Sequence, residues 1–285
     1  MRKKQIQLIP NVITAFGLVC GLFVIFKVNM IEVGSCNYDL VLKSAFLLLL
    51  VALADFVDGA VARAFNAHSD FGVMFDSLAD SISFGVAPSV LFLKTMALEQ
   101  GSLLSFFGAA GAMIYSLCGV LRLVRFNIKS TEAKGNIVEM TIQKKNFTGL
   151  PIPAAAAVAI STNLFLLSPL FSNYVQVSNT ARLIVLSLVN VLLGYLMVSR
   201  WKFPSLKRLN FRMPSFYLAF ITVVVAVFFL YGIFYYFSLV FILFSWAYII
   251  IALVLAIIRT IAGKKSKTLE DFEPDDDDDD EKLNF

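Results

Sequence analysis

Residues 55–80 read DFVDGAVARAFNAHSDFGVMFDSLAD, and this stretch decides how the chain is interpreted. At about 100° per residue of an α-helix, the small and charged residues of its first half share an arc of about 140°; they are Asp55, Asp58, Gly59, Ala62 and Arg63. Those of its second half share about 80°; they are Gly72, Asp76 and Asp80. Two antiparallel helices would therefore turn four carboxylates toward one pocket. On the first of these helices, the small residues Gly59 and Ala62 would let a ligand approach the backbone.

The composition places this stretch in a membrane. Of the 285 residues, 59% are hydrophobic and 15% are charged, against roughly 25% charged in soluble domains. These values exclude a soluble globular protein and a disordered chain. The three cysteines leave at least one unpaired, which excludes a disulfide-framed secreted domain. Because long apolar runs satisfy their backbone in lipid only as helices, the sequence predicts an all-α, polytopic membrane bundle.

A transmembrane helix needs about 20 apolar residues, and eight segments qualify. They lie near residues 11–28, 44–64, 71–95, 103–124, 150–168, 180–199, 214–234 and 237–261. We expect residues 1–10 to be cytoplasmic or interfacial, 11–200 to form the core, 201–263 to add two helices and 264–285 to form a disordered tail. No cleavable signal peptide is evident.

The distribution of Lys and Arg predicts the orientation. With the N-terminus inside, 20 of these residues fall in cytoplasmic segments and 4 on the opposite face. This bias favours cytoplasmic N- and C-termini and an even number of spans. Ten of the 20 acidic residues lie in the tail from Glu270 onward, and that composition predicts a solvated, disordered segment.

The carboxylate cluster itself predicts a metal centre. One Asp at membrane depth costs about 2.5–3.5 kcal/mol, and Arg63 and His68 are the only cations nearby in the sequence. Two divalent ions would balance four carboxylates, and oxygen ligands favour Mg²⁺ or Mn²⁺ over Zn²⁺. Such a pair can clamp a phosphoryl group, which leaves Arg63 to hold a phosphate oxygen. The alternative is that these residues make helix contacts or line an ion path. Asp70 differs from them, as a helix N-cap or first-turn acid.

Residues 55–80 resemble the signature of the CDP-alcohol phosphotransferase family, D-x2-D-G-x2-A-R-x8-G-x3-D-x3-D. Every defined position of this signature is present, from Asp55 to Asp80. The resemblance covers roughly residues 5–200. It implies a six-helix membrane core with a cytoplasmic active site, to which the last two spans are additional. It also implies transfer of a phosphatidyl-type group from a CDP-linked donor to an alcohol, with release of CMP. Membrane lipids and a second copy in a homodimer are implied partners, and no nucleic acid is expected.

The resemblance assigns roles by position. Asp55, Asp58, Asp76 and Asp80 would bind two divalent ions, and Asp80 would also be the base that deprotonates the acceptor. Gly59, Arg63 and Ser69 would contact CDP-diacylglycerol. The entry to the first span, Pro10-Asn11-Val-Ile-Thr14, resembles the family's P-N-x-x-T, which lies beside the nucleotide.

Three further segments bear on the acceptor. They are Ser81–Ser89, Arg122–Asn127 and Phe147–Ala155, and together they resemble the membrane-embedded type of phosphatidylserine synthase, whose acceptor is L-serine. Arg122 and Arg125 could pair with the serine carboxylate, and Asn127 could accept from its ammonium. Alternatively, both arginines anchor a helix end at the cytoplasmic face.

Two other functions remain open at this point. Within the family, glycerol phosphate or an inositol compound could be the acceptor. From another class, an ion or proton transporter could use the Asp cluster as its path. That function predicts polar groups continuing along other spans, whereas here the acids stop on two helices near one face. The sequence does not distinguish a diacyl donor from an ether-lipid donor.

Overall fold

The computed structural model describes residues 2–32, 37–65, 69–96, 101–132, 146–199, 201–204 and 215–262. The chain forms two compact units, Met1–Phe126 with Ile152–Met197, and Asn127–Pro151 with Val198–Phe285. The predicted tail from residue 264 onward lies outside the described residues.

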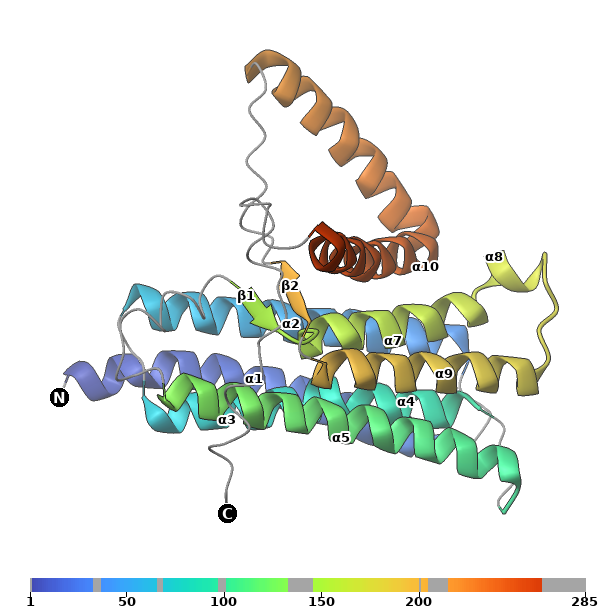
Figure 1. Ribbon diagram of the computed structural model, residues 1–285, viewed down its shortest axis with the longest axis horizontal. Helices are drawn as coiled ribbons and strands as arrows, with labels where there is room; N and C mark the ends of the chain where they lie inside the picture. Colours follow the sequence, from blue (N-terminus) through green and yellow to red (C-terminus); the bar gives the residue numbers. More distant parts are fainter. Residues whose placement is uncertain are drawn as a thin grey trace. The chain divides into compact units, whose positions relative to one another are not determined.

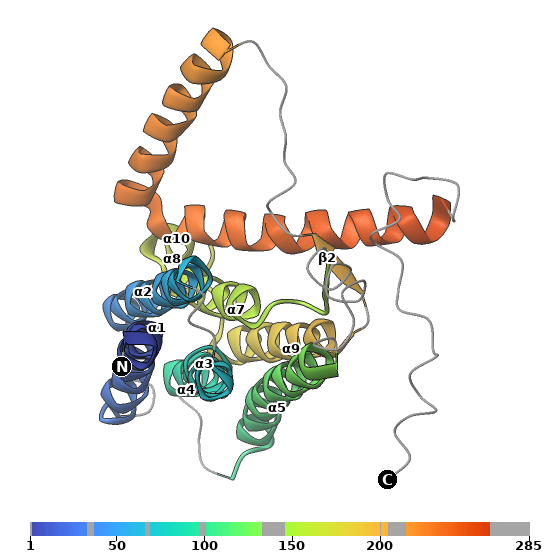
Figure 2. The ribbon, with the colours of Figure 1, turned by 90° about the vertical axis from the view of Figure 1, so that its left-hand side faces the viewer.

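The first unit is a bundle of helices that run along a common direction (Figures 1 and 2). Its elements are α1 (Arg2–Asn29), α2 (Tyr38–Ala64), α3 (Asp70–Asp80), a π-helical segment (Ser81–Val86), α4 (Ala87–Thr95), α5 (Leu103–Glu132, which continues into the second unit), α7 (Ile152–Leu167), α8 (Pro169–Ser172) and α9 (Asn179–Val198). The helix α1 packs against α2, α3, the π segment and α4. On another side, α7 packs against α2, α4 and the π segment. The bundle therefore surrounds the π segment with neighbours from both halves of the sequence.

Five described helices are long and apolar enough to cross a membrane. They contain Leu8–Asn29, Tyr38–Ala64, Leu103–Ile128, Asn179–Val198 and Tyr235–Leu255. The other three predicted spans are helical as well: residues 71–95 form α3, the π segment and α4, residues 152–167 form the shorter α7, and residues 215–235 begin α10. The prediction of an all-α, polytopic membrane protein is confirmed, and the membrane crossing of these three segments stays a prediction.

Polar side chains define where the helices of the bundle begin. The side chain of Asn37 accepts a hydrogen bond from the backbone N–H of Leu40 at 3.2 Å and caps α2. Ser69 caps α3 by accepting from the N–H of Gly72 at 3.0 Å. Such caps satisfy backbone donors that the first turn of a helix leaves unpaired. The helix α2 ends at Ala64 and α3 begins at Asp70, and both pack against α1.

Small residues let the helices of the bundle approach closely, as is common between membrane helices. A Cβ atom at Gly111 of α5 would lie 3.3 Å from the Cα and the carbonyl oxygen of Ser187 in α9. One at Gly194 of α9 would lie 3.3 Å from Sγ of Cys118 in α5. These two contacts fix the distance between α5 and α9.

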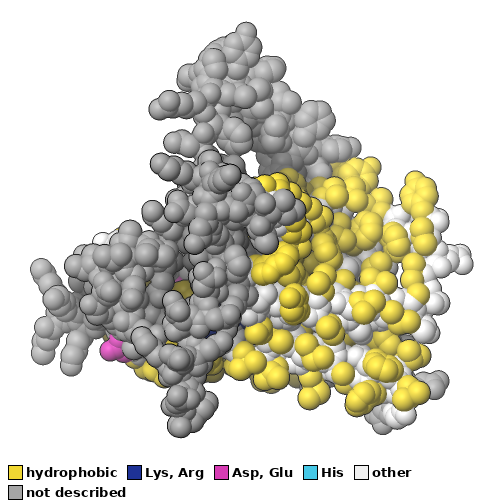
Figure 3. Space-filling view, viewed as in Figure 1, with side chains coloured by type: hydrophobic (Ala, Val, Ile, Leu, Met, Phe, Trp, Pro, Cys, Tyr) yellow, Lys and Arg dark blue, Asp and Glu magenta, His cyan; other side chains and the backbone are white. Residues whose placement is uncertain are grey.

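The surface of the bundle is apolar, as expected of a chain surrounded by lipid. Large hydrophobic side chains are exposed along the spans, among them Phe16 and Phe23 on α1, Leu53 on α2 and Met113 on α5. Figure 3 shows such side chains over much of the described face. In a soluble protein, an exposed apolar surface of this extent would promote association, so it supports the membrane assignment.

The second unit contains the helix α10 (Ser215–Ala262), which is interrupted at Tyr236 (φ −133°, ψ 41°). This break matches the predicted boundary between the last two spans. The unit also holds β1 (Asn146–Thr148) and β2 (Lys202–Pro204), which pair antiparallel with Phe147 opposite Phe203. This short strand pair is the exception to the predicted all-α structure, and its six residues come from segments predicted to connect spans.

We predict that Gly111→Val destabilises the bundle by about 1–3 kcal/mol, the usual cost of overpacking a close contact. The added side chain must push α5 away from the backbone of α9 at Ser187. The control is Met113→Val on the same helix, because Met113 is 70% exposed. Unfolding in detergent measures both; equal stability of the two variants would contradict the close contact.

Candidate active site

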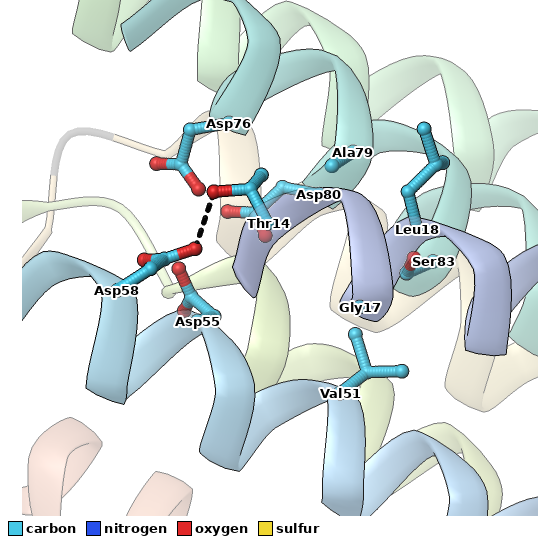
Figure 4. A pocket seen from close by; sticks show the side chains of 10 residues that line it. All are labelled: Thr14, Gly17, Leu18, Val51, Asp55, Asp58, Asp76, Ala79, Asp80 and Ser83. Atoms are coloured by element: carbon cyan, nitrogen blue, oxygen red, sulfur yellow. Dashed lines mark hydrogen bonds between the residues drawn. The ribbon is translucent and has the colours of Figure 1, made fainter. Parts of the chain in front are cut away.

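Three carboxylates from two helices converge at one point of the bundle. One carboxylate oxygen each from Asp55 on α2 and from Asp76 and Asp80 on α3 lie within 4.8 Å of one another. They line a pocket with α1 and the π segment, and the other lining residues are Thr14, Gly17, Leu18, Val51, Asp58, Ala79 and Ser83. Figure 4 shows the four Asp side chains turned toward one another. The predicted convergence of the two helical arcs is present in the structure.

Asp58 belongs to the pocket but not to the group of three. Its side chain is 4% exposed, and its Oδ2 accepts a hydrogen bond from the Thr14 hydroxyl at 2.6 Å (Figure 4). The same hydroxyl lies 3.0 Å from the carbonyl oxygen of Pro10. Thr14 therefore links the P-N-x-x-T entry of α1 to the carboxylate cluster and orients one oxygen of Asp58.

Arg63 lies across the glycine of the signature. A Cβ atom at Gly59 would be 3.3 Å from Nη1 of Arg63. The positive charge of Arg63 acts on Asp55 and Asp58. The space that Gly59 leaves on α2 is thus occupied by the guanidinium of Arg63, next to the carboxylates.

The start of α3 meets the start of α1. A Cβ atom at Gly72 would lie 2.9 Å from Oδ1 of Asn11 and 3.0 Å from Oγ of Ser69. The cap of α3 is Ser69, and Asp70 is the first-turn acid, which settles the two roles considered for Asp70. Asn11, Ser69 and Gly72 therefore lie close together where α1 meets the start of α3. The contacts of Asn11 and Ser69 with CDP-diacylglycerol stay a prediction.

The expectation that only Arg63 and His68 supply positive charge near the cluster is wrong. The charge of Arg122 on α5 also acts on Asp80, and the Arg122 side chain is 8% exposed. Sequence spacing could not show this, because 42 residues separate the two positions. His68 lies outside the described residues.

The three residues predicted to bind serine do not all lie in the same unit of the chain. Arg122 and Arg125 both lie on α5 within the first unit, and Arg125 is half-buried. Asn127 falls in the second unit. The structure therefore brings Arg122 to the carboxylate cluster, whereas the serine-binding roles of all three residues stay predictions.

Sequence reasoning missed Ser83. This residue lies on the π segment, lines the pocket and is fully buried. Its Oγ has no hydrogen-bond partner within the described part of the chain. A Cβ atom at Gly21 of α1 would collide with it. The signal was the serine-rich stretch Ser81–Ser89, which directly continues the carboxylate motif.

The donor set fits a hard divalent cation. The clustered groups are carboxylates, which suit Mg²⁺, Mn²⁺ or Ca²⁺. Four ionised carboxylates with Arg63 and Arg122 nearby still carry a formal charge of about −2, and a low dielectric makes that excess costly. The acidic cluster is therefore compatible with binding a divalent metal ion.

Comparison with known proteins agrees with this geometry. A family model described as CDP-alcohol phosphatidyltransferase matches residues 7–190. The CDP-diacylglycerol–serine O-phosphatidyltransferase of Helicobacter pylori (strain ATCC 700392 / 26695) is 33% identical over 216 residues, which cover 76% of this chain and 80% of that protein. The protein of the same name from Bacillus subtilis (strain 168) is 34% identical over 200 residues, 70% of this chain and 92% of that protein.

An archaeal relative matches a shorter part of the chain. The archaetidylserine synthase of Methanothermobacter thermautotrophicus is 40% identical over 132 residues, 45% of this chain and 47% of that protein. The family match spans the pocket, both carboxylate helices and α5 up to its end. The chain belongs to the CDP-alcohol phosphatidyltransferase family.

Proposed function

We propose that the chain is a CDP-diacylglycerol–serine O-phosphatidyltransferase, an enzyme of phospholipid synthesis in the membrane. It transfers the phosphatidyl group of CDP-diacylglycerol to the hydroxyl of L-serine and releases CMP. The observation that carries this proposal is the convergence of Asp55, Asp76 and Asp80 in one pocket. The names of the relatives from Helicobacter pylori and Bacillus subtilis support the choice of serine.

Two divalent ions, Mg²⁺ or Mn²⁺, would be held by the four carboxylates of the pocket. Asp55, Asp76 and Asp80 supply a ready group of oxygens, and Asp58 offers the oxygen that Thr14 does not bind. Bound ions would neutralise charge on the pyrophosphate of the donor. The positive charge of two divalent ions would be larger than the formal charge of about −2 that the cluster and its two arginines carry. The negative charge of the pyrophosphate would offset this excess.

The donor would lie along the edge formed by α1 and the start of α3. Asn11 and Ser69 offer an amide and a hydroxyl there, within reach of the same glycine. Thr14 holds Asp58, and Arg63, lying over Gly59, can pair with a phosphate oxygen. In this arrangement Asn11, Thr14, Gly59, Arg63 and Ser69 form the CDP-diacylglycerol site.

Asp80 would act as the general base. Its carboxylate takes the proton of the serine hydroxyl, and the serine oxygen attacks the β-phosphorus of CDP-diacylglycerol in a single displacement. The bond between that phosphorus and the oxygen of CMP breaks, and CMP leaves with the electron pair. Because the charge of Arg122 acts on Asp80, an acceptor carboxylate paired with Arg122 would bring its hydroxyl near the base. Arg125 and Asn127 would complete the serine site.

The setting of the site in the membrane follows from the charge distribution. The excess of Lys and Arg predicts cytoplasmic N- and C-termini, and the end of α2 and the start of α3 would then lie toward the cytoplasm. The acyl chains would stay in lipid while the nucleotide and serine arrive from water. A homodimer in the cytoplasmic membrane remains part of the proposal.

We predict that Asp76→Asn lowers Mn²⁺ affinity by at least about tenfold, since residues that merely hold metal ligands in place contribute about 10–100-fold. Transfer to serine should fall with it. The matched control is Asp70→Asn, because Asp70 is the exposed first-turn acid of the same helix. Mn²⁺ titration followed by electron paramagnetic resonance measures both; equal affinities would contradict the metal site.

For Asp80→Asn we predict a loss of kcat of about 10²–10⁴-fold, the usual contribution of a general base. The assay follows labelled serine into lipid with detergent-purified protein and saturating Mn²⁺. Mn²⁺ binding measured in parallel separates loss of the base from loss of a ligand. Normal turnover would refute the assignment of Asp80 as base.

Arg125→Gln should raise the KM for serine by about tenfold or more, because a lost hydrogen bond to a charged group costs about 1.5–3 kcal/mol. The KM for CDP-diacylglycerol should stay unchanged. Lys43→Gln is the control for loss of one positive charge, since Lys43 is exposed on α2. CMP release with serine, glycerol phosphate and inositol compounds also tests the acceptor; a preference for either alternative would overturn the proposal of serine.

A further inference from the structure

The π segment Ser81–Val86 connects the last residue of α3, Asp80, to α4. At its end the backbone N–H of Ala87 donates to the carbonyl of Ile82, five residues earlier, in place of the α-helical partner four residues earlier. A π-helical turn inserted between α-helices changes the rotation of one relative to the other, and such turns are frequent at functional sites. The side chains of α3 therefore face the pocket in a direction that this segment determines.

Pro88 leaves one carbonyl of the π segment without its α-helical donor. A proline has no backbone N–H, so it cannot donate to the carbonyl four residues earlier. That carbonyl belongs to Phe84, inside the π segment. An unpaired carbonyl in a buried helix is costly, so a donor from outside the helix is required.

The missing donor comes from α5. The hydroxyl of Tyr115 donates to the carbonyl oxygen of Phe84 at 2.9 Å, and the Tyr115 side chain is fully buried. The neighbouring Ser116 hydroxyl lies 2.9 Å from the carbonyl oxygen of Gly85. Hydroxyls of α5 thus contact two successive carbonyls of the π segment, and at Phe84 the Tyr115 hydroxyl takes the place of the donor that Pro88 lacks.

The same face of α5 also carries Arg122. Arg122 follows Tyr115 by seven residues, which is about two helical turns, so both side chains lie on one face of α5. The charge of Arg122 acts on Asp80. One helix face therefore contacts the segment that aims Asp80 and also acts on Asp80 itself.

The π segment also shapes the pocket wall at Ser83. Serine hydroxyls elsewhere in the bundle bond to the carbonyl four residues earlier, as Ser44 does to Leu40 and Ser77 to Val73. Ser83 makes no such bond, and its buried Oγ faces the pocket without a partner in the described chain.

We propose that Tyr115 is a positioning residue of the reaction: its hydroxyl holds the π segment, and the π segment sets the direction in which Asp80 and Ser83 face the carboxylate cluster. This inference rests on the proposed function for its kinetic consequences. Its geometric consequence, the relative placement of Asp80 with respect to Asp55 and Asp76, affects metal binding as well.

The first variant is Tyr115→Phe, which removes only the hydroxyl. We expect Mn²⁺ affinity and kcat each to fall by about ten- to hundredfold, as is typical when a group that holds a metal ligand in place is removed. The KM for CDP-diacylglycerol should change little. Thr162→Val is the matched control, since its hydroxyl is buried and lies 2.7 Å from a backbone carbonyl, that of Val158 on α7; it should lose stability without losing Mn²⁺ affinity.

The second variant adds Pro88→Ala to Tyr115→Phe. The new N–H at position 88 has the α-helical spacing from the carbonyl of Phe84, so it can replace the lost hydroxyl. We expect the double variant to regain thermal stability over Tyr115→Phe while kcat and Mn²⁺ affinity stay low, because an α-helical turn would aim Asp80 differently. Stability would then recover without activity.

Two results would overturn the inference. One is a Tyr115→Phe protein with wild-type kcat and Mn²⁺ affinity. The other is a double variant in which activity returns together with stability, since Tyr115 would then act on stability alone. If wild-type protein does not transfer phosphatidyl groups to serine, the proposed function fails, and the Mn²⁺ affinities alone decide whether Tyr115 positions the carboxylates.

Discussion

Repulsion among carboxylates inside an apolar bundle is the constraint on which the rest of this structure depends. Each Asp at membrane depth costs about 2.5–3.5 kcal/mol, and Asp55, Asp76 and Asp80 have oxygens within 4.8 Å of one another. The two arginines whose charges act on the cluster, Arg63 and Arg122, offset only part of this charge. We propose that divalent cations and a polyanionic substrate neutralise the remaining charge. The repulsion among the carboxylates of the free site therefore favours binding of both.

The bundle holds this unfavourable arrangement from several sides. On α1, Thr14 binds Asp58, and Asn11 lies against Gly72 at the start of α3. On α5, Tyr115 and Ser116 supply hydrogen bonds to the π segment that follows Asp80. Close contacts at Gly21, Gly111 and Gly194 keep these helices near enough to do so. The described carboxylates of the pocket come from α2 and α3 alone, which favours a localised catalytic centre over an ion path through the bundle.

Much of this could be predicted from residues 55–80, because helical spacing places Asp55, Asp58, Asp76 and Asp80 on two arcs and the bilayer forces both segments to be helices. Apolar run lengths likewise predicted that these segments up to α9 are helical, although α1, α2 and α5 extend beyond the predicted runs by six to nine residues at one end. What the sequence could not show depends on contacts between distant segments. The approach of Arg122 to Asp80, the bond from Thr14 to Asp58 and the donation of Tyr115 to Phe84 join positions 42, 44 and 31 residues apart. Pro88 signals the disturbed helix in the sequence, but only the fold reveals which hydroxyl compensates for it.

The most direct test of this account is the number and placement of metal ions in the wild-type protein. Purified protein titrated with Mn²⁺ and followed by electron paramagnetic resonance should bind two ions per chain, with the spin–spin coupling of a closely spaced pair. Bound CDP-diacylglycerol should increase the affinity of the protein for both ions. Absence of bound Mn²⁺, or two ions too far apart to couple, would contradict a dinuclear centre in the carboxylate pocket.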